Sequence, residues 1–144
     1  MNTLLDTRQD LILVVDDDRD SRAILELLLT HEGYEVVTAG DCQLAVEVAL
    51  GQPVDLILLD LRMPQLGGEA FCQAYRAGGG RAPVLIMSAA DSTVVQAAAE
   101  GCGASACIPK PFQIESMLRT IDRHLGQRRP WNDDLAPNGP RPRA

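Results

Sequence analysis

Six polar side chains in this sequence stand where short apolar runs end, a placement that suits chemistry better than core packing. They are Asp16, Asp17, Asp18, Asp60, Ser88 and Lys110. Lys110 is the only lysine in the chain. Carboxylates that share a site repel one another unless a cation compensates them. A divalent ion and the Lys110 ammonium together would neutralise three carboxylates, and oxygen ligands at a wet edge suit Mg²⁺ better than zinc.

A Mg²⁺ ion beside one lysine is also what a phosphoryl group needs, because both neutralise its oxygens. An aspartate can itself attack phosphorus and take the group. Asp60 is the natural nucleophile, since it is the single acid at the end of its apolar run. Ser88 could donate a hydroxyl hydrogen bond to the phosphoryl oxygens. Asp18 and Asp20 are expected instead to cap the helix that follows them.

Five apolar runs alternate with stretches of helical periodicity. The runs predict strands at 11–15, 35–38, 56–59, 83–87 and 104–108. The periodic stretches predict helices at 20–32, 41–50, 66–77, 91–100 and 112–125. Gly33 is expected to end the first helix, and Asp41 to cap the second.

This alternation predicts an α/β fold, a doubly wound five-stranded parallel sheet flanked by five helices, as in flavodoxin-like proteins. The common strand order for five such strands is 2-1-3-4-5. Ligands in these folds bind outside the carboxyl ends of the strands, where the strand order reverses. That point lies between the first and third strands, so Asp16, Asp17 and Asp60 should converge there, with Ser88 and Lys110 on the flank.

The composition argues against several classes of function. Apolar residues make up 46% of the chain and aromatic residues only 3%, which indicates a soluble domain with an aliphatic core. The formal charge of −7 argues against a nucleic-acid or anionic-membrane partner. No signal peptide or membrane-length apolar run is evident, so a cytoplasmic location is expected. The cysteines are expected to be free thiols, with no disulfide or zinc site. They are Cys42, Cys72, Cys102 and Cys107.

The charge divides the chain into unequal parts. Residues 1–126 hold nine Lys and Arg against eighteen Asp and Glu, whereas residues 127–144 hold four Arg against two Asp. The latter segment is also rich in proline, and its composition predicts disorder. We therefore expect a short extension at 1–9, a folded domain at 10–126 and a disordered tail at 127–144.

Four sequence motifs in register closely resemble the receiver domain of two-component response regulators. The motifs are Val14-Val-Asp-Asp-Asp18, Leu58-Leu-Asp-Leu-Arg-Met-Pro64, Met87-Ser-Ala89 and Pro109-Lys-Pro-Phe112. Each is weak alone, but their order and spacing together are specific, and the resemblance covers roughly residues 10–126.

The resemblance implies a role for each motif residue. Asp60 would accept a phosphoryl group, and Asp16, Asp17, Asp60 and the backbone carbonyl of Arg62 would bind Mg²⁺. Ser88 would be the switch hydroxyl, Ala89 the small residue that leaves room for the phosphoryl group, and Lys110 the lysine that contacts it. The Lys110–Pro111 peptide bond would be cis, which only an X–Pro bond adopts readily.

One position departs from the family pattern. The family usually has Tyr or Phe three residues before the lysine, and this chain has Cys107. We hypothesise that Cys107 lies in or near a partner-facing surface, and that the output is a shift of the loop between the fourth strand and the fourth helix.

The resemblance further implies a protein that signals rather than an enzyme with its own substrate. Its partners would be a sensor histidine kinase or phosphotransfer protein, and a downstream protein on the face of the fourth helix, fifth strand and fifth helix. Direct nucleic-acid or membrane binding is not expected. Two alternatives stay open. One is a small haloacid-dehalogenase-type phosphatase, whose pattern Asp16, Asp18, Ser88 and Lys110 superficially match, although that family also needs a later acidic pair at a strand end. The other is an interaction module with an inactive pocket.

Overall fold

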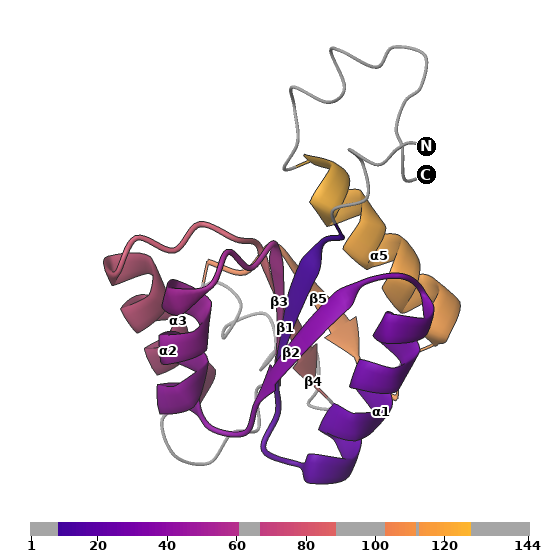
Figure 1. The fold of residues 1–144 in the computed structure, drawn as a ribbon, viewed down its shortest axis with the longest axis horizontal. Coiled ribbons are helices and arrows are strands. Elements are labelled where there is room, and N and C mark those ends of the chain that lie inside the picture. Colours follow the sequence, from indigo (N-terminus) through magenta and orange to yellow (C-terminus); the bar gives the residue numbers. More distant parts are fainter. Residues whose placement is uncertain (1–8, 61–66, 89–102, 112, 128–144) are drawn as a thin grey trace.

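Five parallel strands form one sheet in the order β2-β1-β3-β4-β5, as predicted (Figure 1). The computed structural model describes residues 9–60, 67–88, 103–111 and 113–127. The strands are β1 (Leu11–Val15), β2 (Glu35–Ala39), β3 (Leu56–Asp60), β4 (Val84–Ser88) and β5 (Ala106–Pro109). β1, β3 and β4 occupy the centre, which explains why their sequences are apolar without alternation.

Helices cover both faces of the sheet, two on each within the described part of the chain. They are α1 (Arg19–His31), α2 (Cys42–Gly51), α3 (Gly67–Ala77) and α5 (Ile114–Gln127). Figure 1 shows α1 and α5 on one side of the strands and α2 and α3 on the other. The helix predicted at 91–100 lies outside the described residues, as do Arg62, Ala89, Cys102, the segment 1–8 and the tail 128–144.

Successive residues of the central strands enter two separate cores. Leu13, Ile57 and Ile86 pack with residues of α2 and α3. Ile12 and Leu58 pack on the opposite face with residues of α1 and α5. The sheet is therefore buried between two aliphatic layers.

The helix ends follow local capping chemistry. The Asp18 side chain accepts a hydrogen bond from the Asp20 backbone N–H and caps α1, while the Asp41 side chain accepts one from Leu44 and caps α2. Gly33 follows α1 with a φ of 101°, a left-handed conformation that glycine adopts without strain. The caps predicted at Asp18 and Asp41 are thus confirmed. The capping role also predicted for Asp20 is wrong, because α1 starts at Arg19, one residue earlier than predicted, and Asp20 lies in its first turn.

The last strand and helix start later than predicted. β5 begins at Ala106 rather than at 104, after Gly103 with its positive φ and the bond from Ser105 N–H to the Val84 carbonyl. α5 begins at Ile114 rather than at 112, because the helical hydrogen bond of Met117 reaches back only to Gln113. Among the described residues, none of the helices has the length and apolar character that a membrane span requires.

Candidate functional site

Three acidic residues and one lysine from distant parts of the chain meet at the carboxyl edge of the sheet. Asp16 and Asp17 follow β1, Asp60 is the last residue of β3, and Lys110 follows β5. β1 lies between β2 and β3. The chain passes from β1 to β2 on one side and then crosses to β3 on the other side, so the strand order reverses between β1 and β3. The predicted convergence at the reversal of strand order is therefore confirmed as geometry.

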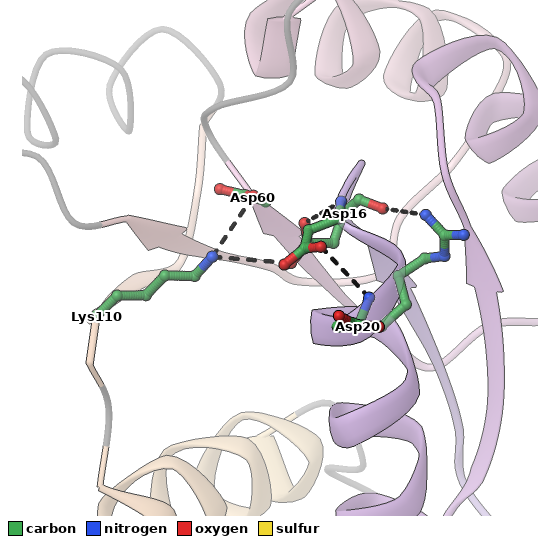
Figure 2. A network of polar contacts seen from close by, with 6 residues as sticks. Asp16, Asp20, Asp60 and Lys110 are labelled. Carbon is green, nitrogen blue, oxygen red and sulfur yellow. Dashed lines mark hydrogen bonds and ion pairs between the residues drawn. The ribbon is translucent and has the colours of Figure 1, made fainter.

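The carboxylates are close enough to share one cation. One carboxylate oxygen from each of Asp16, Asp17 and Asp60 lies within 4.8 Å of the others. The Lys110 ammonium lies 3.5 Å from Asp60 Oδ2 and 3.7 Å from Asp16 Oδ2. In Figure 2 the lysine extends toward the space between these two carboxylates. The side chains of Asp16 and Asp60 are 0% and 2% exposed, whereas Asp17 is exposed to solvent.

Asp16 is the most constrained of the three acids. Its backbone N–H donates to the Ala39 carbonyl at 3.1 Å, and its Oδ1 accepts from Asp18 N–H at 2.9 Å. Its backbone carbonyl accepts from the Arg22 guanidinium at 2.8 Å. Only Oδ2 is left, and this buried atom has an ion pair with Lys110 but no hydrogen-bond donor.

Burial disfavours the charged form of the Asp16 carboxylate. The pKa of Asp16 is raised from 3.8 to about 6, mainly because burial removes its solvation and in part because Asp60 lies beside it. The Asp18 N–H and the Lys110 ammonium oppose this rise. A carboxylate oxygen that is buried, lacks a donor and sits among other acids fits a hard cation. The residues present therefore fit a Mg²⁺ ion.

Ser88 and Lys110 are joined through the backbone at the end of β4. The Lys110 N–H donates to the Ser88 carbonyl at 2.9 Å, and Ser88 is 3% exposed. The Lys110–Pro111 bond is cis, as predicted. Two further predicted site residues, Arg62 and Ala89, lie outside the described residues.

Asp18 belongs to the helix rather than to the acidic cluster. Its Oδ1 accepts from the Asp20 N–H at 3.3 Å, the capping role expected for it. Arg22 is the residue near the site that sequence reasoning missed. Its contact depends on how α1 docks against the loop after β2, which no local pattern in the sequence reports.

Cys107 lies on the exposed surface of β5. With Gln113, Ser116, Met117 and Thr120 it lines a cavity of about 290 Å³ beside α5. Partial burial raises the pKa of its thiol. Cys42 and Cys72 lie in the interior, and none of the three cysteines within the described ranges forms a disulfide bond.

The sequence and the fold both match known proteins. The family model of the response regulator receiver domain matches residues 12–122. Response regulator MprA of Mycobacterium leprae is 38% identical over 87% of this chain, and response regulator ArlR of Staphylococcus aureus is 38% identical over 89%. These matches span only 54% and 58% of the two relatives, so the chain corresponds to about half of their length.

Two solved structures illustrate the likeness in fold. The chemotaxis protein CheY4 of Vibrio cholerae matches with a TM-score of 0.75 and 30% identity, over 81% of this chain and 98% of that chain. The receiver domain of sensor histidine kinase PA1611 from Pseudomonas aeruginosa matches with a TM-score of 0.77 and 28% identity, over 83% and 99%. That structure has a magnesium ion coordinated in its active site cleft. The chain described here belongs to the response regulator receiver domain family.

Proposed function

We propose that this receiver domain accepts a phosphoryl group on Asp60 from a histidine kinase or phosphotransfer protein, in a Mg²⁺-dependent reaction, and then controls a protein partner. The observation that carries the proposal is the convergence of three carboxylates within 4.8 Å of one another, with the Lys110 ammonium 3.5 Å from Asp60. The unit that acts would be residues 10–126, in the cytoplasm.

The reaction is a transfer between two nucleophiles. An Asp60 carboxylate oxygen forms a bond to phosphorus while the P–N bond to the donor imidazole breaks, and its electron pair leaves with the imidazole nitrogen. Hydrolysis later removes the phosphoryl group from Asp60. Water attacks phosphorus, the bond between phosphorus and the Asp60 oxygen breaks, and phosphate and the free carboxylate are released. The domain thus turns over no substrate of its own beyond taking and slowly losing this group.

The acidic cluster would hold the metal through Asp16, Asp17 and Asp60, with the Arg62 carbonyl as a further ligand. Mg²⁺, when bound there, neutralises charge on the phosphoryl oxygens. Asp16 Oδ2 suits this role because its partner oxygen, Oδ1, is already engaged by a backbone N–H. Lys110 offers the only other positive charge close to Asp60 in the described part of the site, and would follow the phosphoryl oxygens after transfer.

Ser88 and Ala89 would complete the site on the β4 side. The Ser88 hydroxyl would donate to a phosphoryl oxygen, and the small Ala89 would leave room for the group. Because Ser88 is tied to the Lys110 backbone, a movement at Ser88 would be passed to the start of the segment after β5. This coupling supports a switch that biases two arrangements of the β4 end.

The downstream partner would bind the face of the domain that carries Cys107. An exposed thiol beside a cavity replaces the aromatic ring typical of the family, so the readout would rest on the loop after β4. Amide NMR signals of residues 88–108 should therefore move between the free protein and a phosphoryl-mimic complex. Unchanged signals in this range would refute this route of output.

The phosphatase alternative has little support. That mechanism needs Asp18 in the site, whereas Asp18 caps α1. It also needs a later acidic pair at a strand end, and the only later pair in the sequence, Asp133 and Asp134, belongs to the polar, proline-rich segment 127–144. The inactive-module alternative differs from our proposal in one observable: an inactive module would not take up a phosphoryl group on Asp60.

A small donor with a P–N bond tests the proposed function without knowledge of the kinase. Phosphoramidate and Mg²⁺ should produce a new ³¹P NMR signal of an acyl phosphate on the wild-type protein. The signal should be absent in EDTA and absent from Asp60→Asn. A folded wild-type protein that binds Mg²⁺ but never shows this signal would favour the interaction module.

A further inference from the structure

One arginine contacts the backbone of a candidate metal ligand, on the side away from the acidic cluster. The Arg22 guanidinium, carried by α1, donates through Nη1 to the backbone carbonyl of Asp16 at 2.8 Å. It also lies against Gly40, between β2 and α2, where a Cβ atom would meet Nη1 at 2.7 Å and Cζ at 3.1 Å. The absence of a side chain at Gly40 therefore makes the space in which the guanidinium lies.

These contacts complete the restraint of Asp16. The N–H, the carbonyl and Oδ1 each have a hydrogen-bond partner, supplied by Ala39, Arg22 and Asp18 respectively. With those three polar atoms held, Oδ2 points at Lys110 and lies close to the Asp17 and Asp60 carboxylates. Figure 2 shows the Asp16 contacts on both sides of the residue.

We propose that Arg22 is a positioning residue for Mg²⁺: it holds the Asp16 backbone so that Oδ2 faces the metal position, and Gly40 is required to seat it. This inference rests on the proposed function, because it assumes that the acidic cluster binds Mg²⁺. Partners that orient a metal ligand typically contribute about 10–100-fold to metal affinity. Arg22 acts through Asp16 and does not itself bind the ion.

The charge of Arg22 makes the proposal sharply testable. A guanidinium near the site repels a cation, so its removal should strengthen Mg²⁺ binding if charge were its only contribution. Positioning predicts the opposite sign, because Asp16 loses the bond that orients it. The direction of the change in Mg²⁺ affinity thus separates the two effects.

Gly40→Ala disturbs the same contact without any change in charge. The Gly40 backbone does not have a positive φ, so alanine fits its conformation. The clash falls on the far end of a flexible side chain, which can swing away, so the fold should survive while the guanidinium leaves its seat. This variant keeps the test valid if Arg22→Met fails to fold.

The experiment is a calorimetric Mg²⁺ titration of wild type, Arg22→Met, Gly40→Ala and the double variant, at physiological ionic strength to screen distant charges. Arg19→Met is the matched control, because Arg19 is an exposed arginine on the same helix. Both single variants should bind Mg²⁺ about tenfold more weakly. The double variant should bind like Arg22→Met alone, since residues in one contact are not additive. Arg19→Met should bind as wild type or slightly tighter.

An amide NMR spectrum reports the bond itself. The Asp17 amide follows the Asp16 carbonyl, so its ¹⁵N shift in the metal-free protein should change in Arg22→Met and Gly40→Ala but not in Arg19→Met. Unchanged or tighter Mg²⁺ binding by folded Arg22→Met and Gly40→Ala would overturn the proposal and leave the proposed function intact. Failure of the wild type to bind Mg²⁺ would instead overturn the proposed function and this inference with it.

Discussion

The Lys110 ammonium lies 3.5 Å from Asp60 Oδ2, although the two residues are 50 positions apart in the sequence and lie at the ends of strands that are not neighbours. Asp60 ends β3 and Lys110 follows β5, with β4 between them. The lysine side chain is 21% exposed, whereas the carboxylate is almost fully buried. A partly hydrated cation thus reaches a buried acid, and it can adjust when the charge of that acid changes.

Replacing Lys110 should destabilise the metal-free protein. Lys110→Met removes the positive charge from two buried carboxylates, those of Asp16 and Asp60. Loss of one partner from a fully buried pair costs roughly 3–5 kcal/mol, and the partial exposure of Lys110 should reduce this to about 1–3 kcal/mol. Urea unfolding in EDTA measures the change. Arg119→Met, which removes an exposed cation from α5, should have little effect.

Magnesium should offset this loss, because it supplies the missing positive charge. Saturating Mg²⁺ should therefore raise the melting temperature of Lys110→Met by more than it raises that of the wild type. Equal stability of wild type and Lys110→Met in EDTA would contradict the account of the acidic cluster.

The effect of Asp16 on stability should depend on pH in a defined direction. Its folded-state pKa is about 6 against an ordinary value of 3.8, so the folded state holds the proton more tightly than the unfolded state. The cost of the charged form is therefore fully present above about pH 6 and disappears as the pH falls toward 4. Asp16→Asn, whose side-chain oxygen can still accept from Asp18 N–H, should be more stable than wild type at pH 8 in EDTA.

That advantage should shrink steadily when the same pair is compared at pH 5. Asp17→Asn is the control, because Asp17 is exposed and water already screens its charge. Chemical denaturation at the two pH values gives both differences. If the stability advantage of Asp16→Asn over wild type grew on acidification, the pKa of Asp16 would not be raised by folding, and the inferred cost of its burial would be wrong.

The thiols should react with alkylating reagents according to burial. Cys107 is exposed on β5, while Cys42 and Cys72 are only 3% and 1% exposed. In a Cys102→Ser background, iodoacetamide should add one label to the native protein, at Cys107, and three labels after denaturation. The raised pKa of Cys107 lowers its thiolate fraction, so labelling at pH 8 should be slower than for a free cysteine. Native labelling of Cys72 before Cys107 would contradict the exposed position of β5.

The sequence predicts most of this fold because its signals are local. Apolar runs without alternation marked β1, β3 and β4, and Asp18, Asp41 and Gly33 marked helix ends through their own chemistry. The convergence of Asp16, Asp60 and Lys110 also followed, because the carboxyl ends of parallel strands share one edge of the sheet.

The unpredicted features depend on contacts between distant segments. The bond from Arg22 to the Asp16 carbonyl requires α1 to dock against Gly40, and nothing in the α1 sequence distinguishes Arg22 from a solvent-facing arginine. The unequal burial of the adjacent residues Asp16 and Asp17 is likewise set by the course of the chain after β1. Such details decide which acid bears the electrostatic cost, and only the packed structure reveals them.

Intact-protein mass spectrometry after incubation with acetyl phosphate and Mg²⁺ tests the central claim most directly. The account predicts a single phosphoryl adduct on the wild type, absent without Mg²⁺ and absent from Asp60→Ala, with folding of the variant checked by circular dichroism. An adduct that persists in Asp60→Ala but disappears in Asp16→Ala would contradict the assignment of Asp60 as the phosphoryl acceptor.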